Sequence, residues 1–251
     1  IMKYWVRTKN SDMHVIPTDT LYLTIDKEAV KKSGMMMACD TIPDRMVISL
    51  AGKRALYKND LMMLEMLAQC NWTRPLYVAT TVGGDNYMNL GDNFVQEGLA
   101  YRITPFTTNK PGAKNFDTEK TYNNVMNRFK FGGLDKKGLY LDETVRRMCM
   151  THKRLFISLA THLIQEGKDD KAKKVLTYMN KVMPAYNVPN EFLAGGVEGE
   201  RCYTLLGMKK EAAQAIKDMW KSSMQYMRWY LSLSQNRFMQ SQQECINNLY
   251  Y

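Results

Sequence analysis

The sequence predicts two kinds of structure in succession. A small α/β domain with a partly parallel sheet is expected over residues 1–110, followed by an all-α domain of tetratricopeptide-like helical hairpins over residues 111–251. Three observations support this division. Short runs rich in β-branched and aromatic residues fill the first half, a connector rich in Gly, Pro, Asn and Lys follows at 107–117, and apolar residues at helical spacing dominate beyond it.

Four runs in the first half have the composition of β-strands. They are LYLTI (21–25), MVISL (46–50), LYVAT (76–80) and AYRIT (100–104). A helix is expected between the second and the third run. Its predicted features are a cap at Asn59, an apolar face of Leu61, Leu64, Met66 and Leu67, and a left-handed Asn71 after its end. A strand, a helix and a strand in this order are typical of a right-handed crossover, so parallel pairing is expected.

A long amphipathic helix is predicted in the second half, after a cap at Asp142 or Thr144. Its apolar positions recur at helical spacing: Val145, Met148, His152, Leu155, Phe156, Leu159 and Leu163. The stretch that follows has the spacing of a tetratricopeptide repeat, with Gly167 at the turn and Ala160 and Ala172 where the helices cross. A weaker copy contains Gly207 and Ala212, and NVPNEFLAGG between the copies indicates an insertion.

The formal net charge of +10 is concentrated in the second half of the chain. Residues 1–110 contain 13 Lys and Arg against 11 Asp and Glu, whereas the remainder contains 22 against 14. Acidic residues interrupt the densest cluster, KDDKAKK (168–174), as they do on solvated helix faces. Because no nucleic-acid-binding module is recognisable, a nucleic-acid partner is not expected. No apolar run is long enough to span a bilayer, no signal peptide is visible, and the start at Ile1 suggests a fragment of a longer protein.

The sequence offers no residue for catalysis or metal binding. The three histidines are scattered, the five cysteines form no CxxC pair, and no HExxH, Walker or GxSxG motif occurs. His152 lies on the predicted apolar stripe and is expected to pack there rather than to act as a base. We therefore expect no catalytic residue, no metal and no cofactor in this chain.

One loop is the candidate ligand site. The run VGGDN follows a predicted strand, and ligands of open α/β folds collect at the carboxyl ends of parallel strands. The candidate residues are Lys53, Thr81, Gly83, Gly84, Asp85 and Asn86. The same residues also suit a plain turn, because glycines accept positive φ and Asp and Asn are common in turns. The sequence leaves both interpretations open.

The stretch around this loop resembles a known family. The matching residues are Asn71, Trp72, Arg74, Pro75, Tyr77 and Ala79, then Glu97, Gly98, Leu99, Ala100, Tyr101, Arg102 and Pro105. With YNNVMNRFKFGGLD (122–135), LDETVRRM (141–148) and the repeat-like helices, they resemble the soluble C-terminal part of a bacterial family of multi-spanning membrane proteins over roughly residues 58–184. That family is classed with GT-C-type glycosyltransferases that are similar to protein O-mannosyltransferases.

The resemblance implies a parent protein whose transferase chemistry lies in a membrane domain outside this chain. It implies a periplasmic location and a non-catalytic role, with a protein or peptide partner such as the acceptor protein. The alternative is a small ligand-binding or enzymatic α/β domain that uses the Gly83–Asn86 loop. Helical-hairpin arrays offer concave surfaces suited to polypeptide segments, which favours the first hypothesis.

The purified chain is expected to transfer no sugar from a lipid-linked or nucleotide donor to a peptide acceptor. General acid–base catalysis requires a group within hydrogen-bond reach of its proton, and no residue can be nominated for that role. The assay compares the chain with its Asp85→Ala variant. Turnover that disappears in the variant would identify the glycine loop as an active site.

Overall fold

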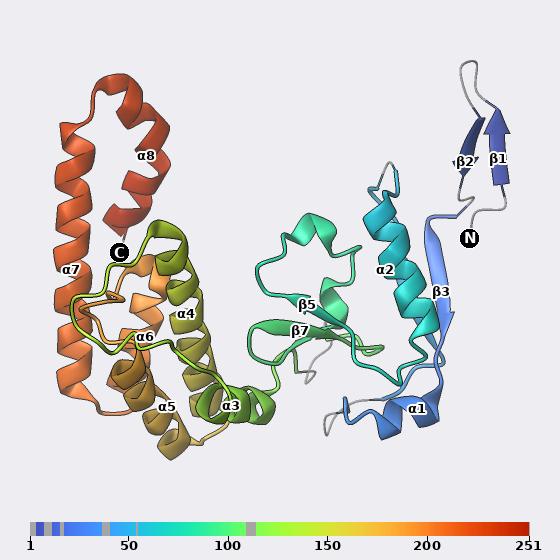
Figure 1. Cartoon of the computed structure of the whole chain (residues 1–251), viewed down its shortest axis with the longest axis horizontal. Helices are drawn as coiled ribbons and strands as arrows, with labels where there is room; N and C mark the ends of the chain where they lie inside the picture. Colours follow the sequence, from blue (N-terminus) through green and yellow to red (C-terminus); the bar gives the residue numbers. More distant parts are fainter. Residues whose placement is uncertain are drawn as a thin grey trace. The chain divides into compact units, whose positions relative to one another are not determined.

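The computed structural model describes residues 4–7, 12–15, 18–36, 41–53, 55–108 and 114–250. The chain forms two compact units, Ile1–Asp117 and Thr118–Tyr251. The first combines strands and helices, and the second is helical (Figure 1). The predicted mixed fold with a helical C-terminal part is therefore confirmed. Of the predicted connector, residues 109–113 lie outside the described residues.

Within the described residues, the strands of the first unit form three small antiparallel sheets. The first pairs β1 (Tyr4–Arg7) with β2 (Asp12–Val15), and the second pairs β3 (Thr20–Thr24) with β4 (Arg45–Ser49). The third has the order β5 (Tyr77–Ala79), β7 (Ala100–Ile103), β6 (Phe94–Gln96). The four predicted runs thus correspond to β3, β4, β5 and β7.

The predicted parallel crossover is wrong. β4 and β5 lie in different sheets, and each pairs in antiparallel fashion with another strand. The physical reason lies in β5, which has only three residues, of which Tyr77 and Ala79 are exposed. A strand of a parallel sheet needs cover on both faces, whereas an antiparallel strand tolerates one solvated face.

Two helices, α1 (Lys27–Lys32) and α2 (Lys58–Gln69), belong to the first unit. The predicted cap of α2 at Asn59 is wrong, because the helix begins after Tyr57 and the Asp60 carboxylate accepts from the Tyr57 N–H at 2.9 Å. The predicted left-handed Asn71 is confirmed, with φ of 43°.

The core of the first unit joins α2 to β4 and to the third sheet. Its buried members include Met46, Ile48, Leu64, Leu67, Trp72, Leu90, Phe94 and Ile103. On α2, Leu64 and Leu67 are buried as predicted, but Met66 is exposed. The apolar face of α2 is therefore narrower than the sequence suggests.

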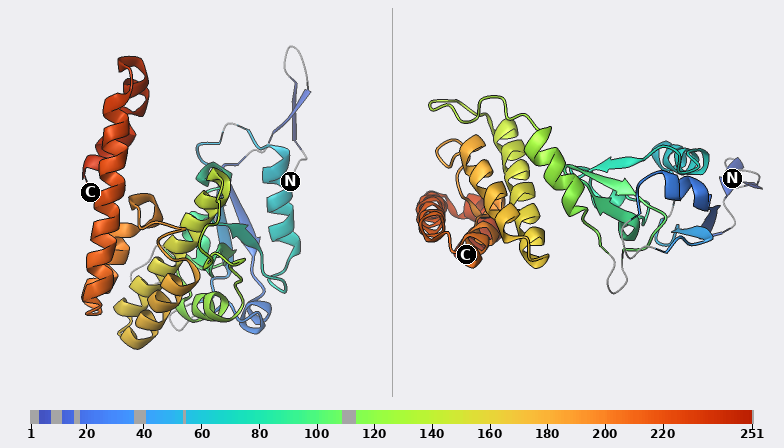
Figure 2. Two further views of the ribbon diagram at one scale, coloured as in Figure 1. Left: turned by 60° about the vertical axis from the view of Figure 1, so that its left-hand side comes forward. Right: turned by 90° about the horizontal axis from the view of Figure 1, so that it is seen from below.

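The second unit contains six helices and one 3₁₀ turn among the described residues. They are α3 (Thr118–Asn127), α4 (Glu143–Gln165), α5 (Asp169–Val182), η3 (Phe192–Ala194), α6 (Gly196–Leu205), α7 (Lys209–Ser232) and α8 (Gln235–Tyr250). Helices α4 and α5 form one hairpin and α6 and α7 a second, and α4 also packs on α6. Figure 2 shows α8 folding back beside the C-terminal part of α7.

Both hairpins turn through the same glycine motif. Gly167 and Gly207 have φ of 70° and 72°, and each follows the last turn of a helix. The N–H after each glycine donates to a carbonyl five residues back, Lys168 to Leu163 and Met208 to Tyr203, both at 2.8 Å. This is the Schellman arrangement, which favours glycine because its left-handed residue carries no Cβ penalty. The tetratricopeptide assignment of these hairpins stays a prediction.

Helix α4 is the central element of the second unit. Asp142 is its cap, accepting from the Val145 N–H at 2.9 Å. Of the predicted apolar positions, the four from Leu155 to Leu163 are buried, whereas Val145 and Met148 are exposed. His152 lies against the rings of Phe129 and Phe131, with centroids 6.1 and 6.4 Å away. This aromatic contact agrees with its expected packing role.

Four cysteines of the described part carry free thiols. Cys149, Cys202 and Cys245 are buried, and Cys70 is half-buried. Cys39 lies outside the described residues. Among the described helices, none combines the length and the apolar character needed to cross a bilayer.

Replacing Ala172 by leucine is expected to destabilise the second unit by roughly 1–3 kcal/mol. Ala172 is fully buried at the start of α5, five residues after Gly167, so three added carbon atoms would overpack the hairpin. Urea unfolding followed by circular dichroism measures the effect. Ala213→Leu, at an exposed position of α7, is the matched control. Equal midpoints for both variants would contradict the predicted tight crossing.

Candidate functional site

The predicted ligand loop is an exposed turn. Thr81, Gly83, Gly84, Asp85 and Asn86 are all exposed, and the last three form the 3₁₀ turn η1 (Gly84–Asn86). Neither glycine has positive φ, which contradicts the expected use of their left-handed freedom. The loop also follows an antiparallel strand, so it does not lie at the carboxyl edge of a parallel sheet. Ligand binding by this loop stays a prediction.

Left-handed residues occur just beyond this loop. Met88 and Asn89 have φ of 51° and 57°. The Asn89 amide donates to the carbonyls of Ser49 and Ala51, at 2.9 and 3.1 Å. These two hydrogen bonds hold the segment after η1 against the end of β4. A second 3₁₀ turn, η2 (Gly91–Asn93), leads from there into β6.

Lys53 has a structural partner. Its ammonium lies 2.9 Å from the Asp60 carboxylate, which is buried at the start of α2. Burial acts to raise the pKa of Asp60, but the bonds from Lys53 and from the Tyr57 N–H outweigh it and lower the pKa. Asp60 is therefore charged at neutral pH, and Lys53 neutralises it.

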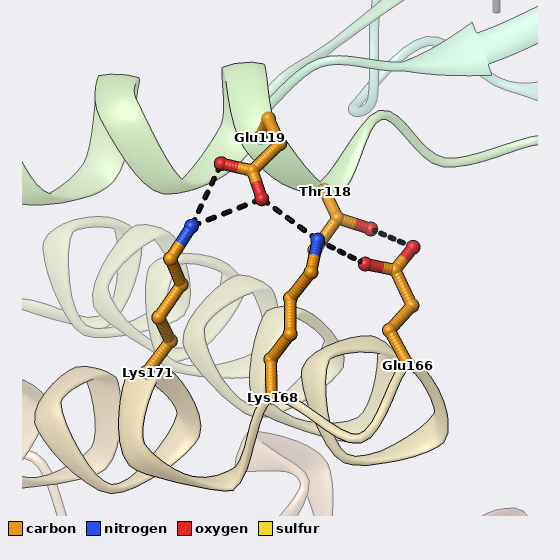
Figure 3. Close-up of polar contacts among 5 residues, drawn as sticks. All are labelled: Thr118, Glu119, Glu166, Lys168 and Lys171. Carbon is orange, nitrogen blue, oxygen red and sulfur yellow. Dashed lines mark hydrogen bonds and ion pairs between the residues drawn. The ribbon is translucent and has the colours of Figure 1, made fainter. Parts of the chain in front are cut away.

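A cluster of charged side chains joins α3 to the turn between α4 and α5 (Figure 3). Glu119 binds Lys168 at 2.7 Å and Lys171 at 2.9 Å, and Lys168 also binds Glu166 at 2.7 Å. Thr118 donates to Glu166 at 3.1 Å. Hydrogen bonds from the two lysines lower the pKa of Glu119, and its carboxylate in turn raises the pKa of Lys168. Each charge in the cluster has a partner, so we assign the cluster a structural role.

A cavity of about 360 Å³ lies between α4 and α6, within the second unit. Its lining residues are Arg154, Ile157, Ser158, Thr161 and His162 of α4, with Phe192, Gly195 and Glu198. We call this site the α4–α6 groove. Ile157 and Phe192 give it an apolar floor, and Arg154 and Glu198 place opposite charges at its exposed edge. None of these residues was predicted from the sequence to belong to a site.

Two glycines bring α6 close enough to form the groove. A Cβ atom at Gly195 would lie 3.3 Å from Cδ1 of Ile157, and one at Gly199 would lie 3.1 Å from the same atom. Gly195 also has φ of 79°, a conformation that larger residues adopt only under strain. The GG pair inside the predicted insertion NVPNEFLAGG is the sequence signal that could have indicated a close approach.

The polar side chains of the groove are held by the helix backbone. The His162 ring nitrogen Nδ1 lies 2.8 Å from the Ser158 carbonyl, and the Thr161 hydroxyl donates to the Ile157 carbonyl at 3.0 Å. Thr161 also lies 3.3 Å from the sulfur of Cys202. No group of three metal-ligating side chains occurs in the part of the chain that the structure describes. The lining of the groove combines side chains of both charges with hydroxyl groups and apolar side chains.

A buried lysine supports one wall of the groove. Lys153, on α4, is 1% exposed, and its ammonium donates to the Val188 carbonyl at 2.7 Å. Burial lowers the pKa of Lys153 to about 8, although the carboxylates of Asp218 and Glu191 act in the opposite direction. Because Val188 precedes η3, this bond fixes the segment that carries Phe192 into the groove.

Further contacts hold the same segment. Glu191 forms an ion pair with Arg146 of α4, and the Asn190 amide donates to Asp218 of α7 at 3.0 Å. Sequence reasoning missed Lys153, although its place at helical spacing between Cys149 and Phe156 puts it on the buried face. A lysine on such a face must find an acceptor in the fold.

Replacing Lys153 by methionine is expected to change how stability depends on pH. The folded-state pKa of about 8 lies below the ordinary value of about 10.4, so the unfolded chain binds this proton more tightly. The lysine therefore costs stability at neutral pH, and this cost falls as the pH rises through that interval. The unfolding free energy of the wild type, minus that of Lys153→Met, should increase by about 2 kcal/mol between about pH 7 and about pH 10.

Urea titrations of the second unit at several pH values measure this difference. Lys174→Met, at an exposed position of α5, is the matched control and should give a pH-independent difference. The same pH-independent result for Lys153→Met would show that its pKa is not lowered.

Comparison with known proteins gives one family match. Residues 2–121, slightly less than half of the chain, match the family model of TMEM260-associated domain 2, so the chain is similar to that domain over this segment. No curated protein and no solved structure matches the chain significantly. The matched segment covers the first unit and ends within α3, so the α4–α6 groove lies outside it.

Proposed function

We propose that this chain is a non-catalytic, partner-binding region of a membrane-associated protein, and that the α4–α6 groove holds a segment of the partner polypeptide. The observation that carries the proposal is the groove itself. It is a cavity of about 360 Å³ in an array of helical hairpins, with an apolar floor and a charge of each sign at its edge.

The lining of the groove suits a polypeptide. Ile157 and Phe192 would contact an apolar side chain, and the hydroxyl of Ser158 is of the kind that bonds to peptide groups. Arg154 favours an acidic residue of the partner and Glu198 a basic one. In addition, no ion pair fixes Arg154 or Glu198 among the described residues, and both side chains are exposed.

The family match supports the membrane-associated context. TMEM260-associated domain 2 takes its name from TMEM260, and the resemblance to membrane glycosyltransferases points in the same direction. In this context the partner would be the acceptor protein of the parent enzyme, and the region would lie in the periplasm. The exposed loop at Gly83–Asn86 offers no comparable enclosure, which is why we place recognition in the groove.

Site-specific photo-crosslinking in the full-length protein tests this function. A benzoylphenylalanine replaces Glu198 at the edge of the groove or, as a control, Lys174 on the exposed face of α5. Irradiation is expected to join a polypeptide to position 198 but not to position 174, and mass spectrometry of the adduct identifies the segment.

A second set of variants shows whether the groove makes the contact. Arg154→Glu and Phe192→Ala are each expected to reduce the yield of the adduct about tenfold, because interface anchors carry most of the binding energy. Lys173→Glu, which changes the charge to the same extent outside the groove, should leave the yield unchanged. Equal cross-linking at both positions, or a yield insensitive to Arg154→Glu, would contradict the proposed role.

A further inference from the structure

Helix α7 carries an apolar stripe that the fold does not cover. Its members are Ile216, Trp220, Met224 and Leu231, with exposed fractions of 53%, 67%, 39% and 77%. Their spacing of four, four and seven residues places them within an arc of about 80° on an ideal helix. We call this surface the α7 stripe. A row of exposed large apolar side chains of this kind marks an interaction surface.

The α7 stripe is not needed to hold the helix in place. Ala212, Ala215 and Tyr230 are the buried residues of α7, and on an ideal helix they lie beside the stripe, about 40° or more from its edge at Ile216. Helix α6 packs against α7, and α8 contacts the C-terminal part of α7, where the Cys245 sulfur lies 3.9 Å from the sulfur of Met227, a residue within the arc of the stripe. Helix α8 therefore borders the stripe at Met227, whereas the four side chains of the stripe stay exposed to another molecule.

A row of cations borders the stripe on one side. Lys210, Lys217, Lys221 and Arg228 are all exposed, and helical geometry places them within about 40° of one another, next to the apolar arc. No acidic residue of α7 falls in that row, because its acids, Glu211 and Asp218, lie at other angles. The surface thus combines apolar side chains, including an exposed tryptophan, with positive charge along one edge.

From this surface we infer a second binding site, whose occupant is an amphipathic helix of a partner protein with acidic residues along one flank. The stripe runs for about four turns, or roughly 22 Å, which matches the length of a helical recognition segment. Trp220 is the central anchor, since exposed tryptophans dominate such interfaces once they are covered. The cation row sets the orientation of the bound helix through charge complementarity.

Other occupants fit the surface less well. A second copy of this chain would bring four more cations to a protein that already has a net charge of +10. A bilayer is broad, whereas the stripe is about one side chain wide and the anchored face of α7 limits it on the other side. An acidic helix of a partner protein fits both the positive charge and the narrow width of the stripe.

Selection from a displayed library of helical peptides tests the inference. The library keeps apolar residues at helical spacing and varies the flanking positions among Glu, Lys, Gln and Ser. Selection on the complete chain is expected to enrich Glu on one flank. Fluorescence anisotropy with an enriched peptide should show about tenfold or weaker binding for Trp220→Ala and for the pair Lys217→Glu with Lys221→Glu.

Two controls accompany these variants. The pair Lys173→Glu with Lys174→Glu makes the same charge change on α5 and should bind like the wild type. Arg154→Glu, in the α4–α6 groove, should also bind like the wild type, which separates this site from the proposed function. Since the substituted side chains are exposed, thermal melts should match that of the wild type.

Three outcomes would overturn the inference. The first is a selection that enriches no peptide, or peptides without acidic bias. The second is flotation with vesicles of phosphatidylserine and phosphatidylcholine, lost in Trp220→Ala, which would identify a membrane as the occupant. The third is a dimer in analytical ultracentrifugation that Trp220→Ala dissociates, which would identify a second copy.

Discussion

The reversal of the chain at two left-handed glycines is the constraint on which the second unit depends. At Gly167 and Gly207 a side chain would oppose the positive φ, so the hairpins form most readily with glycine there. After each reversal, a buried alanine lies near the start of the second helix of the hairpin: Ala172 in α5 and Ala212 in α7. With α4 and α6 then side by side, Ile157 lies against Gly195, just before α6, and Gly199, within it, and the groove lies between the two helices.

The structure also shows where the positive charge of the second half is used. The densest run in the sequence, at 168–174, supplies Lys168 and Lys171 to the cluster around Glu119, where they hold α3 against the helical turn (Figure 3). Lys153 is enclosed and bonded to a carbonyl. The cations of α7 form a continuous row on the surface. The run at 168–174 was expected on a solvated helix face, and the structure instead uses two of its lysines in contacts between helices.

Element type was predictable from local patterns, and pairing was not. The strands β3, β4, β5 and β7 and the helices α2 and α4 follow from composition and spacing, as do the cap at Asp142 and the left-handed Asn71. Which strand pairs with β5 depends on how distant segments of the chain pack together. The local sequence around β5 does not contain that information. Asn59 failed as a cap because Asp60, one residue later, is bonded both by Lys53 and by the Tyr57 N–H.

No sequence motif predicted the groove, because the groove too depends on which segments pack together. Its lining combines two faces that are separated by some forty positions, and each residue taken alone is ordinary for a helix surface. Lys153 carried a detectable signal, because a charged residue occupies the apolar face of a predicted helix. The glycines of the insertion carried another. Lys153 indicates a buried polar contact, and the glycines indicate a close approach of two helices. Neither signal is part of a catalytic motif.

The buried cysteines give the folded chain a further property. Burial raises the pKa values of the Cys149 and Cys202 thiols, although the hydrogen bond between Cys202 and Thr161 acts to lower that of Cys202. Oxidants and alkylating agents attack the thiolate, so these sulfurs are unreactive for as long as the helices stay packed. Opening of the second unit would release them together. In an oxidising compartment these two thiols would thus stay reduced while the second unit is folded, and unfolded copies would be exposed to cross-linking through them.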